Sequence, residues 1–143
     1  MMLRTIPLLV FLAGLFSGHA WAKECSRENA IAAESIPYYI ESWYKMSEAF
    51  AFYGHCDDGS IAEAFSDSIV RLLASRWESV RELDRESRKN PAFKAFVLRH
   101  IDATAATEDL RRVESMSVYK CPKGLSSLCQ QIQTAVKEAG RDQ

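Results

Sequence analysis

Residues 54–83, GHCDDGSIAEAFSDSIVRLLASRWESVREL, form the stretch of sequence that decides the fold. A tight turn with a cysteine comes first. The long segment after it has apolar residues at spacings of three and four, as on one face of an α-helix. The pattern predicts one long helix over residues 61–83, with Ser60 as its N-cap and the rest of the chain packed against its apolar stripe. The stripe consists of Ile61, Phe65, Ile69, Leu72, Leu73, Trp77, Val80 and Leu83.

The segments on both sides of this stretch carry helical patterns of their own. Residues 36–53 are predicted to form one helix, since Pro37 suits the first helical turn and Gly54 suits the position just past a helix end. Residues 23–35 fit either a short helix or an extended arm, and the sequence leaves this open. Further helices are expected over residues 91–101, 107–120 and 126–139, with N-caps at Asn90, Thr107 and Ser126.

The patterns together predict an all-α fold. The sequence has no run of alternating β-branched residues, no Asn-Gly hairpin signal and no internal repeat. Helices joined by short loops are typical of a compact bundle, here of about five helices with two disulfides. Residues 23–143 are long enough to bury a core of their own, so we expect them to form a single helical domain.

Residues 1–22 are predicted to be a cleavable signal peptide rather than part of the fold. They carry a basic residue, Arg4, ahead of an apolar run, and Ala20-Trp21-Ala22 has the small-x-small pattern of a cleavage site. Cleavage after Ala22 places Cys25 away from the new N-terminus, which argues against a lipid anchor. No later segment is long and apolar enough to insert into a membrane. We therefore expect a soluble protein that is periplasmic or secreted.

All four cysteines lie in the part of the chain that is expected to be exported. An even number in an oxidising compartment predicts two disulfides, although four cysteines allow three pairings. We favour Cys121–Cys129, because Cys121-Pro122-Lys123-Gly124 is typical of a turn that brings the next helix back. Cys25 then pairs with Cys56 by elimination and ties the N-terminal segment to the turn before the long helix.

The charge of the chain excludes some classes of partner. Lysine and arginine together number 18 and aspartate and glutamate 19, so the formal net charge is −1. The two signs are interleaved, as on a solvated helix face. Nucleic acid and anionic membranes both attract a basic stripe, which this sequence lacks. We therefore expect a protein partner rather than a nucleic acid or a membrane.

Three groups of residues offer candidate chemistry, and each has a simpler structural explanation. The turn His55-Cys56-Asp57-Asp58 crowds metal-capable side chains together, but consecutive residues cannot all face one metal ion. Glu63 and Asp67 share a helix face, where Arg71 is expected to pair with Asp67. His100 lies on the apolar side of its helix and is expected to be packed and hydrogen-bonded. We predict no catalytic residue, no metal and no cofactor.

The segment over residues 36–53 is aromatic on nearly every side, which is typical of a helix that is buried or forms an interface. The simpler interpretation is the central helix of the bundle. The alternative is that part of this surface meets a partner, because tyrosine and tryptophan serve well as interface anchors. The candidate partner-binding residues are Tyr38, Tyr39 and Tyr53, together with the acidic turn residues Asp57 and Asp58.

In outline the chain resembles the small periplasmic all-helical immunity proteins that neutralise type VI secretion amidase effectors. The resemblance rests on the leader, the turn Cys56-Asp57-Asp58-Gly59 before a long helix, and the late Cys121-Pro122…Cys129 pair. It implies an inhibitor of a periplasmic effector enzyme and assigns no inhibitory residue. Residues 61–67 and 96–102 also look like segments of uncharacterised exported bacterial helical proteins.

These observations predict a non-enzymatic, exported protein-binding module, with an inhibitor or immunity protein as its most specific form. The first alternative is a structural or adaptor component of an envelope complex. The second is a small metal-dependent enzyme. A monomer and a homodimer both remain open. The residues on which such an enzyme would depend are His55, Asp57, Asp58, Glu63 and His100.

Overall fold

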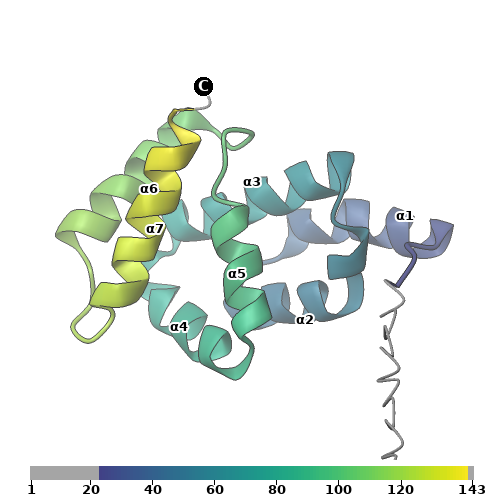
Figure 1. Cartoon of the computed structure of the whole chain (residues 1–143), viewed down its shortest axis with the longest axis horizontal. Coiled ribbons are helices and arrows are strands. Elements are labelled where there is room, and N and C mark those ends of the chain that lie inside the picture. Colours follow the sequence, from purple (N-terminus) through teal and green to yellow (C-terminus); the bar gives the residue numbers. More distant parts are fainter. Residues whose placement is uncertain (1–22, 142–143) are drawn as a thin grey trace, which may run out of the picture.

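The computed structural model describes residues 23–141 and is all-helical, as predicted (Figure 1). This part of the chain contains seven α-helices rather than about five, with three short 3₁₀ helices and no strand. The predicted signal peptide, residues 1–22, lies outside the described residues. The elements are α1 (Arg27–Ser35), η1 (Ile36–Tyr39), α2 (Trp43–Tyr53), η2 (Gly54–Cys56), α3 (Gly59–Ser75), η3 (Trp77–Ser79), α4 (Val80–Lys89), α5 (Pro91–Arg99), α6 (Thr107–Tyr119) and α7 (Ser126–Ala139).

Helix α3 connects the two ends of the molecule. It packs against α1 at one end and against α6 at the other, where α6 and α7 form a pair (Figure 1). Helix α4 packs against both α2 and α5, and α5 also contacts α7. The apolar stripe of α3 is buried as predicted, with Phe65, Ile69, Leu72 and Leu73 almost fully enclosed. No helix of the described residues is long and apolar enough to span a membrane.

The long helix predicted over residues 61–83 is wrong in its extent. It begins earlier, with Asp58 rather than Ser60 as its N-cap, and it ends at Ser75. The backbone of Arg76 leaves the helical region, and η3 then leads into α4 in a new direction. This break lets the indole nitrogen of Trp77 donate a hydrogen bond to the carbonyl of Lys120 at 2.8 Å. The spacing of apolar residues along the sequence cannot reveal such a long-range contact.

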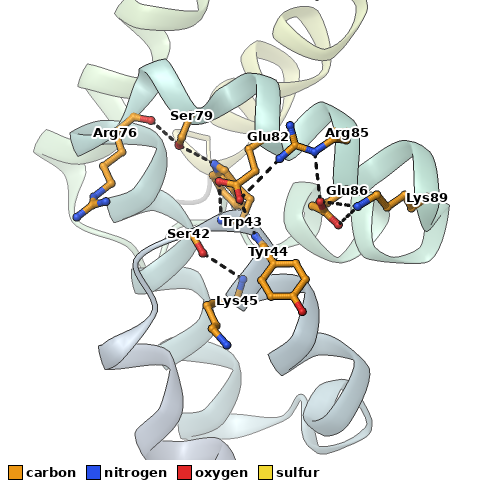
Figure 2. Close-up of polar contacts among 10 residues, drawn as sticks. All are labelled: Ser42, Trp43, Tyr44, Lys45, Arg76, Ser79, Glu82, Arg85, Glu86 and Lys89. Atoms are coloured by element: carbon orange, nitrogen blue, oxygen red, sulfur yellow. Dashed lines mark hydrogen bonds and ion pairs between the residues drawn. The ribbon is translucent and has the colours of Figure 1, made fainter.

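The single helix predicted over residues 36–53 is also wrong, because the chain breaks between η1 and α2. Ile40 is extended, and Ser42 is the N-cap of α2. The carboxylate of Glu82, on α4, accepts hydrogen bonds from the backbone nitrogens of Trp43 at 3.3 Å and Tyr44 at 3.4 Å (Figure 2). A carboxylate is favoured at a helix N-terminus, where free N–H groups and the helix dipole both attract it. The Ser42 hydroxyl accepts from the backbone nitrogen of Lys45 at 3.2 Å, so Ser42 and Glu82 together define where α2 begins.

Both predicted disulfides, Cys25–Cys56 and Cys121–Cys129, are confirmed. The first ties the chain before α1 to η2, and the second closes the loop between α6 and α7. Two disulfides are consistent with an oxidising compartment outside the cytoplasm. Residues 27–35 form helix α1, which settles the choice between helix and arm for most of that segment.

Most of the other predicted helix starts agree with the structure to within one residue. Asn90 is the N-cap of α5, accepting hydrogen bonds from the backbone nitrogens of the second and third helical residues, and Pro91 is the first residue of the helix. Thr107 and Ser126 are the first residues of α6 and α7 rather than their N-caps. Boundaries of this kind depend on local sequence, which is why the sequence places them well.

Candidate functional site

The break between η1 and α2 leaves aromatic side chains at the surface. Within residues 36–53, the side chains enclosed in the core include Trp43, Met46 and Ala49. Tyr39 is 83% exposed and Phe52 is 65% exposed, which is unusual for side chains of this size. The segment is therefore neither a fully buried central helix nor an ordinary solvated one. Its inner face anchors the bundle, and its outer face displays rings to solvent.

These rings border a groove of about 360 Å³ between η1 and α2, which we call the aromatic groove. Its lining is mainly apolar and comes from Ile36, Tyr39, Ile40, Ala49, Phe52 and Tyr53. Lys45 and Glu48 also line it and form an ion pair at 2.8 Å, so the charges on this part of the groove balance. The hydrogen bond from Lys45 lowers the pKa of Glu48, which keeps the carboxylate ionised and the pair intact.

Both walls of the aromatic groove are held from their inner sides. Ser68 on α3 donates a hydrogen bond to the carbonyl of Pro37, which fixes η1 against the core. The Phe50 ring lies 4.8 Å from the Phe96 ring and anchors the inner face of α2. Glu82 fixes the first turn of α2 (Figure 2). The backbone around the groove is thus set by contacts that a partner would not need to displace.

The predicted partner-binding residues fall into separate places. Tyr39 and Tyr53 line the aromatic groove, whereas Tyr38 is exposed beside them on η1 without lining it. Asp58 is the N-cap of α3. The Asp57 side chain is only 10% exposed, because its carboxylate is occupied by α5. The structure therefore brings two of the tyrosines together but not the acidic turn with them.

Asp57 belongs instead to a buried polar cluster that sequence reasoning missed. Its carboxylate lies 2.6 Å from Nη2 of Arg99 and 3.0 Å from Nε2 of His100. The other ring nitrogen of His100, Nδ1, lies 2.9 Å from Oγ of Ser66, which is also 2.7 Å from Oδ2 of Asp102. His100 is packed and hydrogen-bonded as predicted, but its partners are 34 and 43 residues away, beyond the reach of local patterns.

The contacts of Ser66, His100 and Asp57 are those of a serine–histidine–aspartate chain, yet the arrangement does not suit nucleophilic catalysis. Ser66 is 1% exposed and His100 is 3% exposed, so a substrate has no access to the hydroxyl. Nucleophilic serines must reach the substrate carbon as well as their base. This row of hydrogen-bonded side chains instead connects three parts of the backbone: the turn before α3, α3 itself, and the loop after α5.

A second buried charge, Glu86 on α4, was hidden within a run of charged residues. Its side chain is almost fully enclosed, and its carboxylate lies 2.9 Å from Nζ of Lys89 and 3.6 Å from Nε of Arg85 (Figure 2). Arg85 also approaches Glu82, the residue that caps α2. The two glutamates and their cations thus stiffen the face of α4 on which α2 rests.

The other candidate residues do not converge on one point. His55 contacts the side-chain amide of Asn29 at 3.2 Å, and Asp67 pairs with Arg71 at 3.9 Å as predicted. Within residues 23–141, no group of three or more histidine, cysteine, aspartate or glutamate side chains is placed to hold a metal ion. Comparison of the chain with protein-family models, with curated proteins and with solved structures finds no match.

Proposed function

We propose that the chain is a non-enzymatic protein-binding module, exported to the periplasm or secreted, which holds a partner protein at the aromatic groove. The observation that carries the proposal is the pair of strongly exposed rings, Tyr39 and Phe52, on opposite walls of an apolar groove. Large rings exposed together in this way mark interaction sites on protein surfaces.

The form of the groove favours a protein partner that inserts apolar side chains. Tyrosine and phenylalanine bury a large area with few rotatable bonds, so binding costs them little conformational entropy. The groove walls are already fixed by Ser68, Phe50 and Glu82, which lowers the ordering cost further. The balanced charges of Lys45 and Glu48 add no preference for a strongly acidic or basic ligand.

An inhibitor of a periplasmic effector enzyme is the most specific form of this proposal. A rigid, disulfide-linked helical chain with preformed anchors suits tight inhibition, since few groups must be ordered when the partner binds. A structural or adaptor role in an envelope complex would use the same groove. The identity of the bound partner separates the two roles.

Phe52→Glu is expected to weaken partner binding roughly thirtyfold, because a carboxylate would be desolvated where an apolar ring was buried; this corresponds to about 2 kcal/mol. The measurement is affinity capture from a periplasmic extract by the oxidised protein without residues 1–22, followed by quantitative mass spectrometry. A stoichiometric hydrolase or toxin that the variant fails to retain supports the inhibitor role. A structural envelope protein with the same behaviour supports the adaptor role.

Tyr119→Glu is the matched control, because Tyr119 is an equally prominent ring at the end of α6 and does not line the groove. It should retain the partner as the unchanged protein does. Equal retention by Phe52→Glu and the unchanged protein would contradict the proposal. So would the absence of any stoichiometric partner.

A further inference from the structure

In the buried cluster around His100, the distances between polar atoms indicate which atoms carry protons. Nε2 of His100 faces the Asp57 carboxylate, with oxygens at 3.0 and 3.1 Å, and an ionised carboxylate can only accept. A hydrogen bond there requires a proton on Nε2. Oγ of Ser66 lies 2.7 Å from the Asp102 carboxylate and 3.1 Å from the carbonyl of Ala62, and the shorter, charge-assisted contact takes the single hydroxyl proton of Ser66.

The remaining contact then fixes the state of the ring. Nδ1 of His100 lies 2.9 Å from Oγ of Ser66. Because the serine proton is given to Asp102, Nδ1 must be the donor and must carry a proton of its own. Both ring nitrogens are then protonated, so all three contacts are satisfied together by the imidazolium form of His100.

A neutral ring cannot satisfy the same three contacts. With its one proton on Nε2, Nδ1 would take the Ser66 proton and leave two acceptor oxygens, of Ser66 and Asp102, facing each other at 2.7 Å. With its proton on Nδ1, the Nε2 lone pair would face the Asp57 carboxylate. Either tautomer breaks one contact, and the one to Asp57 is the stronger because Arg99 holds that carboxylate in place at 2.6 Å.

We propose that the chain Asp57–His100–Ser66–Asp102 is a proton-operated clamp. Protonation of His100 closes it by adding the hydrogen bond from Ser66 on α3 to Asp102 in the loop after α5, while His100 contacts Asp57 and Ser66 in both states. Loss of the proton releases Asp102 from Ser66. Asp102 keeps its contacts with Thr104 in both states, since its other oxygen, Oδ1, accepts from the Thr104 backbone nitrogen at 2.9 Å and hydroxyl at 2.6 Å.

The charged surroundings are balanced when the clamp is closed. The Asp57 carboxylate contacts the ring directly, the Asp102 carboxylate is linked to it through Ser66, and Arg99 pairs with Asp57. Glu138 on α7 lines the surface groove that Arg99 and Asp102 also line. The apolar walls are the Phe96 ring, 4.4 Å from the His100 ring, and the Phe65 ring at 6.0 Å.

Acidification is what closes the clamp. Burial lowers the pKa of His100, and the Asp57 carboxylate opposes this effect only in part. The ring of the folded protein therefore takes up its second proton at a pH below the ordinary histidine pKa of about 6.5. The unfolded chain takes up this proton at the ordinary value. The contribution of His100 to the free energy of unfolding is therefore fully present above about pH 6.5 and is lost as the pH falls through the pKa of the folded ring.

The substitution Ser66→Ala tests the proton count through the sign of its effect. Alanine removes two hydrogen bonds from the protonated form, Nδ1 to Ser66 and Ser66 to Asp102, but only one from the neutral form, Ser66 to Nδ1. The midpoint of the His100 titration should then fall by about half a pH unit or more. The measurement is the ring ¹⁵N chemical shifts of His100 in the oxidised protein between about pH 4.5 and 8. If Ser66 instead stabilises the neutral ring more than the protonated ring, the same substitution raises the midpoint.

Ser68→Ala is the matched control, because Ser68 is equally buried on α3 and donates to the carbonyl of Pro37 rather than to His100. It should leave the midpoint unchanged. In the unchanged protein, the backbone amide of Thr104 should titrate together with the ring. A midpoint that rises or stays constant in Ser66→Ala overturns the clamp, as does a His100 that never takes up a second proton before the protein unfolds.

Discussion

Replacing Trp43 with alanine is expected to lower the free energy of unfolding by about 3–5 kcal/mol, the usual effect of removing a buried tryptophan from a core. Trp43 is fully enclosed at the first position of α2. Its indole nitrogen donates a hydrogen bond to Oγ of Ser79 at 3.0 Å (Figure 2). The substitution leaves a cavity where α2 meets α4. Such a loss is a large part of the 5–15 kcal/mol that typically stabilises a domain.

Tyr44→Ala is the control for the Trp43 substitution, because Tyr44 is the next residue of the same helix and is half exposed. Its loss should cost less than about 1 kcal/mol, as is usual for surface substitutions. Urea unfolding followed by circular dichroism measures both variants. Equal losses from the two substitutions would mean that the junction of α2 and α4 does not carry the stability that its burial indicates.

Removing the Cys25–Cys56 disulfide is expected to lower the free energy of unfolding by about 3.5 kcal/mol, against about 2.5 kcal/mol for Cys121–Cys129. The difference follows from the sequence separations of 31 and 8 residues, because a longer cross-linked loop restricts the unfolded chain more. Each pair is replaced by alanines, and chemical unfolding is compared under oxidising conditions. A larger loss from the shorter loop would show that native contacts, rather than loop closure, set the effect.

The elements that the sequence predicts well are those whose signals are local. The spacing of apolar residues identifies α3, and the Asn-Pro pair marks the start of α5. The proline turn between Cys121 and Cys129 indicates their pairing. In each case the residues that determine the structure lie within a few positions of one another.

At both wrong helix boundaries the chain contacts distant residues, and at the start of α2 the local N-cap Ser42 adds to that contact. Glu82 caps α2 from 39 residues away, and Trp77 reaches the carbonyl of Lys120 across 43 residues. Helical periodicity continues through both breaks, since the apolar residues on either side still face the core. Only the packed structure shows that the helices must stop there.

The sequence predicts which aromatic residues are available for the candidate site, but not how they are arranged around the groove. The aromatic content of residues 36–53 indicates an interface, and Tyr39 and Tyr53 do line the groove. Phe52 is its most exposed ring after Tyr39; the sequence placed it in the aromatic segment but not among the named candidate partner-binding residues. The role of Asp57 depends on α5, whose position relative to the turn before α3 no local pattern reveals.

The central claim, that the aromatic groove holds a partner protein, is tested most directly by photo-crosslinking in the living cell. A benzophenone amino acid is placed at Tyr39 in one variant and at Tyr119 in the other. Both positions are tyrosines of nearly equal exposure, 83% and 79%, and of the two only Tyr39 lines the groove. We expect a discrete covalent adduct from position 39 and none from position 119. The same adduct from both positions, or none from position 39, would contradict the claim.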